Sequence, residues 1–165
     1  MNRYEALKHA VKAHAGQVDK CGQPYILHPI AVAEVFAVRP PDWHLFGEGP
    51  ATFGHAEVVA LLHDVWEDTD YGPIAPLSGE QAAALCLVTH QPGETYADYI
   101  EGVCRDQLAS VVKLADLWHN MSPARMDCLP AKEAASLLPR YLKARARIWE
   151  ALGYEWWPEA LEGQR

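Results

Sequence analysis

Four polar side chains suited to metal and acid–base chemistry follow directly on an apolar run. His63 and Asp64 come after residues 58–62, which are all apolar, and Glu67 and Asp68 come one helical turn later. Residues four apart share a face of a helix, so we expect His63 above Glu67 and Asp64 above Asp68. Such groups at the end of a buried helix are unfavourable unless something binds them. A divalent metal with an activated water would supply that compensation.

Two further residues in apolar surroundings could complete a metal site with His63 and Asp64. His28 lies upstream in PYILHP, Asp116 lies downstream in KLAD, and Asn120 follows one turn after Asp116. Together His28, His63, Asp64 and Asp116 form a set of two imidazoles and two carboxylates. This mixed ligation suits Mn²⁺, Fe²⁺ or Zn²⁺ and is too rich in nitrogen for Ca²⁺.

A metal held by this set would give the neighbouring carboxylates a catalytic role. It lowers the pKa of a bound water from about 15.7 toward about 7 and polarises a phosphoryl oxygen under attack. Glu67 and Asp68 would lie close enough to orient the nucleophile or to transfer protons. Which of the two acts as acid and which as base stays open, because the assignment depends on their pKa values.

Each of these residues also has a structural interpretation. His28 could be a loop histidine at a helix start, His63 and Asp64 a surface pair, and Asp116 a salt-bridged helix residue. His14 fits a buried structural histidine as well as a site residue. The remaining histidines are expected outside the metal ligand set: His9, His44, His55, His90 and His119.

Helical periodicity dominates the elements that must position these side chains. We expect helices over about 3–15, from Pro29 through Phe36, over 55–67, from the cap at Ser78 to Val88, and over 95–103, 107–120 and 131–152. Pro139 predicts a kink or a second helix within the last segment, and Pro123 and Pro130 bracket a connection. No alternating apolar pattern predicts a sheet. The fold class indicated is all-α, a helical bundle.

One long connection interrupts this pattern. Residues 39–54 are rich in Pro and Gly and carry Trp43, His44 and Phe46. Loops of this length are often functional, so the segment is a candidate lid, with core cover as the alternative. The tryptophans, including Trp118 and Trp149, are expected in the core or at an interface. The pair Trp156-Trp157 hints at a homodimer.

Length, composition and charge set limits on the function. The chain has 165 residues, half of them hydrophobic, which fits one domain over 1–165. A formal net charge of −8 argues against polymeric nucleic acid as a partner. The basic run over 140–147 indicates a solvated helix face. A small phosphorylated ligand stays compatible, because a metal and a few lysines offset the charge locally.

The cysteine spacing and the hydropathy of the chain indicate the cellular compartment in which we expect the protein. Cys21, Cys86, Cys104 and Cys128 lack CxxC spacing, so the sequence predicts buried or inert thiols rather than a zinc site or a disulfide framework. No apolar run approaches the roughly 20 residues that a membrane span needs, and no signal peptide is visible. We therefore expect a cytoplasmic protein with no membrane partner.

The order and spacing of several short blocks resemble a known family. The chain is similar to the HD-domain metal-dependent phosphohydrolases, specifically small hydrolase-only relatives of the RelA/SpoT-type (p)ppGpp hydrolases. The matching residues are His14, Ala15, Gly16, Gln17 and Lys20; Gly22, Gln23, Pro24, Tyr25, His28 and Pro29; Leu61, Leu62, His63, Asp64, Glu67, Asp68 and Thr69; Val88, Thr89, Tyr96, Tyr99 and Ile100; Val112, Lys113, Leu114, Ala115, Asp116, His119, Asn120 and Met121.

The resemblance implies specific roles. It makes His28, His63, Asp64 and Asp116 the ligands of one divalent metal, usually Mn²⁺ in that family. It makes Glu67 and Asp68 the residues that activate water and assist departure of the leaving group, and Lys20 and Asn120 substrate contacts. The implied reaction removes the 3′-pyrophosphate of (p)ppGpp, a small nucleotide, and the implied fold is an all-α bundle.

Three departures bear on the substrate. Asp19 stands where the family usually has an arginine that touches the base, Leu117 replaces an arginine, and Pro123 replaces a hydroxyl residue. None belongs to the metal set, so the guanosine specificity is in question and the hydrolysis is not. Two alternatives therefore stay open: a nucleotidase or other phosphomonoesterase, and a non-catalytic nucleotide-binding module. Retention of Glu67 and Asp68 argues against the binding module.

Overall fold

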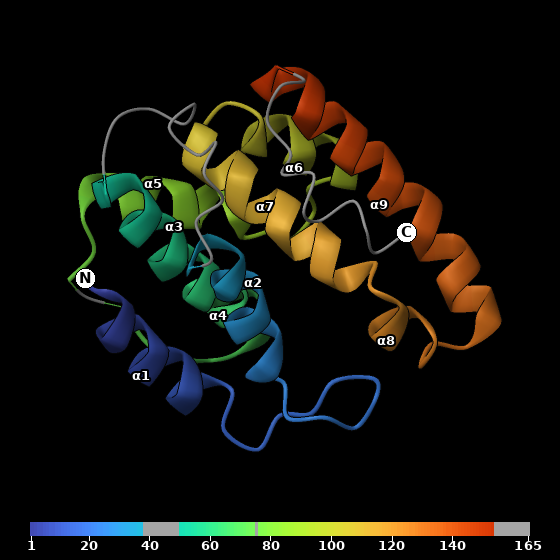
Figure 1. Ribbon diagram of the computed structural model, residues 1–165, viewed down its shortest axis with the longest axis horizontal. Coiled ribbons are helices and arrows are strands. Elements are labelled where there is room, and N and C mark those ends of the chain that lie inside the picture. Colours follow the sequence, from blue (N-terminus) through green and yellow to red (C-terminus); the bar gives the residue numbers. More distant parts are fainter. Residues whose placement is uncertain (38–49, 75, 154–165) are drawn as a thin grey trace.

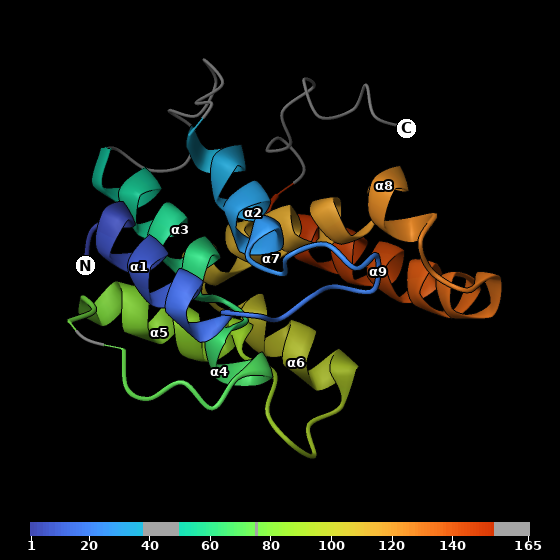
Figure 2. The same cartoon turned by 90° about the horizontal axis from the view of Figure 1, so that it is seen from below.

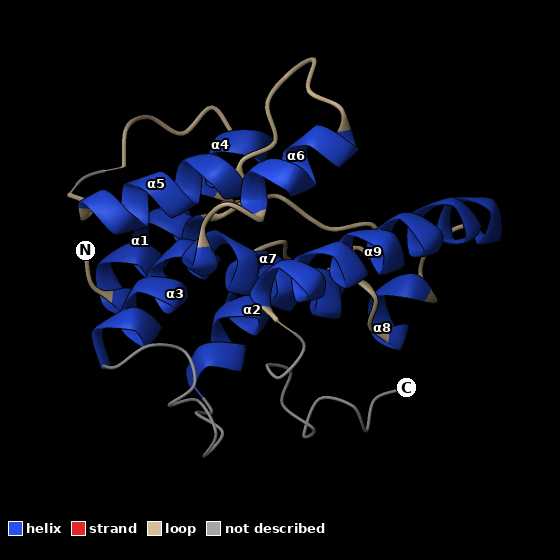
Figure 3. Cartoon of the chain, turned by 90° about the horizontal axis from the view of Figure 1, so that it is seen from above, coloured by secondary structure: helices blue, strands red, loops and turns tan. Residues whose placement is uncertain are grey.

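The computed structural model describes residues 1–37, 50–74 and 76–153, and this part of the chain is all-α (Figure 1). The helices are α1 (Arg3–Ala13), α2 (Leu27–Ala37), α3 (Pro50–Leu62), α4 (Val65–Asp68), α5 (Gly79–Val88), α6 (Tyr96–Val103), α7 (Gln107–Asn120), α8 (Pro123–Met126) and α9 (Ala131–Leu152). Figure 3 shows helices and loops alone within the described ranges. The all-α prediction is confirmed, and a single domain over 1–165 stays a prediction.

Helix α3 lies at the centre of the bundle because its last five residues, 58–62, are all apolar. Ala56 and the run 58–62 are at most 2% exposed. α3 packs against α1, α2, α5 and α7. A helix that is apolar all round is stable only when other helices cover each of its faces.

Helix α7 provides the second wall of the core. It buries Val112, Leu114 and Leu117 and packs against α2, α3, α5 and α9. The long helix α9 runs alongside α7 in Figure 1 and closes the core with Ala144 and Ile148. The site described below lies at the ends of α2, α3 and α7, which this packing brings together.

Local hydrogen bonds explain where several helices start. Ser78 accepts a hydrogen bond from the backbone N–H of Gln81, and the Gln81 side chain accepts one from the Ser78 N–H. Thr95 caps α6 and Asp106 caps α7 in the same way, each through its side-chain oxygen. These caps satisfy N–H groups that a helix start leaves unpaired. The predicted starts after Ser78 and near Thr95 and Gln107 are therefore confirmed.

Two predicted boundaries are wrong around α3. The helix begins at Pro50 rather than at His55, so the connection predicted over 39–54 is shorter at its end; proline suits a first helical turn. The helix predicted over 55–67 is interrupted by a turn at His63 and Asp64. Neighbouring residues of a regular helix do not face each other, and at this turn both side chains reach the same site.

Two proline predictions also need correction. α9 is one continuous helix with Pro139 inside it, so no second helix starts there, and the alternative of a kink stays a prediction. Pro139 and Ala135 are both exposed, so the carbonyl that proline leaves unpaired is open to water. The connection between Pro123 and Pro130 contains the short helix α8.

The prediction of four buried or inert thiols is wrong for two of them. Cys21 and Cys128, 107 residues apart, form a disulfide. Cys86 is an exposed free thiol and Cys104 a half-buried one. The pairing depends on tertiary contact between the loop after α1 and the end of α8, which residue spacing does not encode.

Several expectations fall outside the described residues or concern membranes. The candidate lid residues Trp43, His44 and Phe46 lie outside the described ranges, as do Trp156 and Trp157, so the lid and the homodimer stay predictions. Trp149 packs against the core as expected. Among the helices that the structure describes, none combines the length and apolarity of a bilayer-spanning segment.

Core packing predicts a clear stability difference between two leucines. Leu85 on α5 is fully buried and Leu138 on α9 is 38% exposed. We expect Leu85→Ala to lower the free energy of unfolding by about 2–5 kcal/mol, since it leaves a cavity, and Leu138→Ala by no more than about 0.5 kcal/mol. Urea denaturation followed by circular dichroism measures both. Equal losses for the two variants would contradict the packing described here.

Candidate functional site

Three elements bring the predicted metal ligands together. His28 lies in the first turn of α2, His63 and Asp64 form the turn between α3 and α4, and Asp116 lies in the last turns of α7. The side chains of His28, His63 and Asp116 are 2%, 2% and 4% exposed. The imidazole centroids of His28 and His63 are 5.1 Å apart.

The polar atoms of these four residues point at one another. His28 Nε2 lies 3.1 Å from Asp116 Oδ1 and 3.4 Å from Asp64 Oδ2. His63 Nε2 lies 3.0 Å from Asp64 Oδ2 and 3.5 Å from Asp116 Oδ1. Ligand atoms of His28, His63 and Asp64 all lie within 4.8 Å of one another. One cation between them would be within reach of each residue.

The hydrogen bonds of the imidazoles direct their Nε2 atoms to the centre of the cluster. His63 Nδ1 donates to the carbonyl oxygen of Ala60 at 2.7 Å. His63 Nε2 is buried and makes no hydrogen bond in the described structure, although it faces Asp64 Oδ2 at 3.0 Å. His28 Nδ1 lies 2.7 Å from Nδ1 of His119, so a hydrogen bond orients this ring as well. A buried nitrogen that makes no hydrogen bond is unfavourable, and a cation would satisfy both this nitrogen and the nearby carboxylates, so the residues fit a metal.

Asp116 is held from the other side by two donors. Lys113 Nζ donates to Oδ2 at 2.8 Å, and Asn120 Nδ2 donates to Oδ1 at 2.6 Å. Burial opposes ionisation of Asp116, but Lys113 and the two imidazoles outweigh it and hold the pKa of this carboxyl well below its usual value. Asn120 therefore orients a carboxylate that is charged at neutral pH. Sequence reasoning placed Asn120 here and gave Lys113 no role.

The electrostatics of the cluster favour positive charge. Burial alone would lower the pKa of His63, but the carboxylates of Asp64 and Asp116 hold it well above its usual value. Burial likewise opposes ionisation of Asp64, and His63 and His28 hold its pKa well below the usual range. The buried carboxylate of Asp116 and the half-buried one of Asp64 thus stabilise either an imidazolium or a bound cation at this point.

The two predicted catalytic carboxylates lie beside the cluster on α4. The backbone N–H of Asp68 bonds to the carbonyl of Asp64 at 2.9 Å, which keeps their four-residue spacing despite the turn. Glu67 Oε2 accepts a hydrogen bond from the backbone N–H of His90 at 3.0 Å. Burial raises the pKa of Glu67 from its ordinary value, with partial opposition from this hydrogen bond. A carboxyl group with a raised pKa suits proton transfer.

A cavity of about 500 Å³ opens beside these groups. Its lining includes every predicted site residue except His63, which is buried behind it. Lys20 reaches it from the loop after α1 and also forms an ion pair with Glu133 on α9. The lining residues are Gln17, Val18, Asp19, Lys20, Cys21, Tyr25, His28, Asp64, Glu67, Asp68, His90, Tyr96, Tyr99, Lys113, Asp116, Asn120, Arg125, Leu129, Leu137, Arg140 and Tyr141.

Sequence reasoning missed several residues of this cavity. Tyr25 donates its hydroxyl to Asp64 Oδ2 at 2.7 Å, and burial together with Asp64 raises the pKa of the phenol. Its position three residues before His28 was a usable signal. Arg140 belongs to the run expected to be a solvated face, yet it lines the cavity with its guanidinium 4.8 Å from the Tyr96 ring centroid. Arg125 on α8 had no signal in the sequence.

Comparison with known proteins gives partial but consistent matches. The chain is 33% identical over 161 residues to a protein of Mycobacterium leprae named probable GTP pyrophosphokinase, a match that covers 90% of this chain and 19% of that protein. It is 32% identical over 156 residues to the bifunctional (p)ppGpp synthase/hydrolase RelA of Mycobacterium tuberculosis, covering 87% and 19%. It is 29% identical over 174 residues to the putative chloroplastic GTP diphosphokinase RSH1 of Arabidopsis thaliana, covering 90% and 18%.

These relatives support the resemblance to RelA/SpoT-type enzymes. The chain spans about a fifth of the length of the curated relatives it matches. Two of the three names describe synthesis and one describes both synthesis and hydrolysis. No family model matches the chain.

The cluster predicts a stabilising effect of divalent metal. We expect saturating Mn²⁺ to raise the midpoint of thermal unfolding by about 5 °C or more, since a ligand that binds only the folded state stabilises it. EDTA should reverse the shift and His63→Ala should abolish it. His55→Ala is the matched control, because His55 pairs with Glu80 away from the cluster. A full Mn²⁺ shift in His63→Ala would contradict the assignment.

Proposed function

We propose that this chain is a metal-dependent phosphohydrolase that releases pyrophosphate from the 3′ position of (p)ppGpp. The observation that carries the proposal is the buried Nε2 of His63, which makes no hydrogen bond and faces carboxylate oxygens of Asp64 and Asp116. It lies beside a cavity that the carboxylates of Glu67 and Asp68 also line. The donor set of two imidazoles and two carboxylates suits Mn²⁺, with Fe²⁺ and Zn²⁺ as alternatives.

The residues around the cluster would prepare it for catalysis. A bound metal would supply an acidified water and a Lewis acid for a phosphoryl oxygen. Tyr25 fixes the Asp64 carboxylate through its hydroxyl, and Asn120 and Lys113 fix that of Asp116. Side chains held in this way need little rearrangement during the reaction.

Glu67 is the proposed proton acceptor. Its carboxylate lines the cavity one turn beyond Asp64, and its raised pKa brings it nearer to neutrality. Asp68 lines the same wall and is proposed to assist departure of the leaving group. Both groups would act on the water or on the leaving oxygen rather than on the metal.

The rest of the cavity suits a nucleotide with several phosphates. Lys20, Lys113, Arg125 and Arg140 all line it, in a chain whose formal net charge is −8. Tyr96, Tyr99 and Tyr141 add aromatic surface for a base or a ribose. A volume of about 500 Å³ is that of an ordinary small-ligand site.

Other reactions are compatible with parts of this site. Two of the relatives are named GTP pyrophosphokinase or GTP diphosphokinase, so nucleotide synthesis is one alternative. Hydrolysis of a different nucleotide phosphoester is a second alternative, because the carboxylate of Asp19 lines the cavity. Hydrolysis is preferred because the buried cluster and the adjacent Glu67 provide for activation of water. A non-catalytic nucleotide-binding module would need neither Glu67 nor Asp68.

The proposal predicts a specific product. We expect Mn²⁺-loaded protein to convert ppGpp to GDP and pyrophosphate, with no product in Asp64→Ala. Glu67→Gln should lower kcat by about 10²- to 10⁴-fold, the usual effect of losing a general base or acid, and should keep the Mn²⁺-induced thermal shift. Thin-layer chromatography of labelled ppGpp measures all three proteins.

A control variant and a substrate panel complete this test. Glu34→Gln should keep full activity, because Glu34 pairs with Arg3 outside the cavity. Nucleoside monophosphates assayed for phosphate release test the nucleotidase, and ATP with GTP tests the synthetase. Intact ppGpp after incubation with folded, Mn²⁺-loaded protein would refute the proposed reaction, and ligand-induced stabilisation without turnover would favour the binding module.

A further inference from the structure

The loop after α1 meets α8 along one edge of the cavity. Figure 2 shows this loop extending from α1 toward α8 before it returns to α2. Asp19, Lys20 and Cys21 line the cavity from the loop, and Arg125 lines it from α8. These residues together with Cys128 are termed the seam below. Two stretches of chain far apart in sequence thus form one part of the wall.

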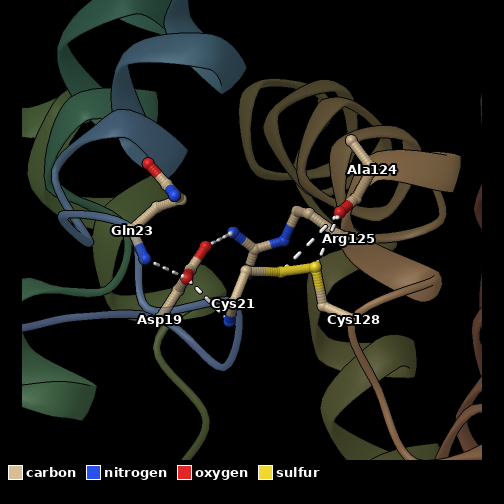
Figure 4. The surroundings of a disulfide bond; sticks show 6 residues. All are labelled: Asp19, Cys21, Gln23, Ala124, Arg125 and Cys128. Carbon is tan, nitrogen blue, oxygen red and sulfur yellow. Dashed lines mark hydrogen bonds and ion pairs between the residues drawn. A yellow bond between two sulfur atoms is a disulfide. The ribbon is translucent and has the colours of Figure 1, made fainter.

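Polar contacts join the loop after α1 to α8 within the seam. Asp19 Oδ1 accepts hydrogen bonds from the backbone N–H groups of Cys21 and Gln23, both at 2.9 Å, which fixes the carboxylate within its loop. Asp19 Oδ2 then lies 3.3 Å from Arg125 Nη1 across the seam. Figure 4 shows the guanidinium of Arg125 directed at this carboxylate, beside the disulfide.

The disulfide Cys21–Cys128 closes the same seam covalently (Figure 4). Cys128 is exposed and Cys21 is half-buried, so small thiols can reach the bond. Exposed disulfides tend to exchange readily and to serve regulatory roles, whereas buried ones are structural. The bond joins the loop to the residues just beyond α8.

The cavity is open while this bond is formed, so the bond does not block it. We expect the disulfide to affect the position of Arg125 instead. A guanidinium has five N–H donors. Among the described residues, Asp19 accepts a hydrogen bond from one of those of Arg125. The remaining donors are available to an anionic group in the cavity, provided that α8 stays against the loop.

We propose that Cys21–Cys128 is a reversible covalent latch that holds Arg125 at the cavity wall, so that the redox state of this pair sets the affinity for an anionic nucleotide. The identity of the nucleotide rests on the proposed function. The oxidised form binds more tightly, because Arg125 is already placed and less side-chain and loop freedom is lost on binding. Arg125 is thereby a specificity-determining residue, and the two cysteines are positioning residues.

A dithiol supplies the electrons and protons that reduce the Cys21–Cys128 disulfide. One thiolate of the dithiol attacks a sulfur of the disulfide, giving a mixed disulfide and releasing one protein thiolate, which takes a proton. The second thiol of the dithiol then displaces the other cysteine and forms the cyclic disulfide of the reagent. The protein gains two electrons and two protons, and the dithiol loses both.

The first experiment uses the unmodified protein. Binding of ppGpp is measured by calorimetry with EDTA present, so that no turnover occurs, after treatment with oxidised or with reduced dithiothreitol. Alkylation and mass spectrometry establish the state of each cysteine. We expect the dissociation constant to rise about three- to tenfold on reduction, the scale of reordering one or two side chains.

Variants separate the latch from other effects of the reagent. Cys21→Ser and Cys128→Ser should bind like the reduced protein in both treatments. Cys86→Ser should respond like the wild type, because Cys86 is a free thiol outside the cavity. Arg125→Gln should bind weakly and equally in both redox states, since the difference depends on that guanidinium.

The outcomes are distinct from those of the hydrolysis assay. Equal dissociation constants in the two redox states, a redox response that survives Arg125→Gln, or no ppGpp binding in either state would each overturn the latch. Free, alkylated Cys21 and Cys128 after oxidation would do the same. A redox-dependent affinity without release of pyrophosphate in Mn²⁺ would keep the latch and refute the proposed reaction.

Discussion

Two carboxylates and two imidazoles share a small buried volume between α2, α3 and α7. Removing such groups from water is unfavourable unless charges are paired and hydrogen bonds are made. Lys113, Asn120 and Tyr25 each donate to Asp64 or Asp116, and Ala60 and His119 bond the Nδ1 atoms of the imidazoles. His63 Nε2 makes no hydrogen bond and faces the carboxylate oxygens of Asp64 and Asp116. The apolar run of α3 carries the cluster into the interior, and the turn at its end allows two adjacent side chains to converge.

The cavity beside the cluster is lined by groups of both charges. Asp64, Glu67 and Asp68 line it, and so do basic groups from the loop after α1 and from α7, α8 and α9. Carboxylates that could hold or assist a metal, together with cations in the same cavity, suit a ligand with phosphates in more than one place. An acidic chain can thus present a locally basic surface to a small anion.

Local patterns of residues predicted the parts of the site that lie on regular elements. His63 and Asp64 stand at the end of an apolar run and Asp116 stands inside one, so the cost of burying them unpaired was visible in the sequence. Ser78 and Thr95 marked helix starts through their side-chain oxygens.

Contacts between distant segments had no such signal. Arg125 reaches the cavity from a four-residue helix, and Arg140 lies on a face that its neighbours made basic and polar. The pairing of Cys21 with Cys128 follows from the path of the loop after α1, and that path is set by tertiary packing rather than by local preference. The start of α3 at Pro50 was hidden by the proline and glycine residues around it.

The disulfide also changes the denatured chain. His28, His63, Asp64 and Asp116 all lie between Cys21 and Cys128, so the oxidised polypeptide keeps them inside one macrocycle even when every helix has melted. All of α1 and all of α9 lie outside that macrocycle, as open ends of the chain. A closed loop of roughly 100 residues removes denatured-state entropy equivalent to about 4–5 kcal/mol in the chain-entropy model. Oxidation therefore stabilises the segment that carries the cluster against unfolding. The helices α1 and α9 gain stability from it only through their packing against that segment.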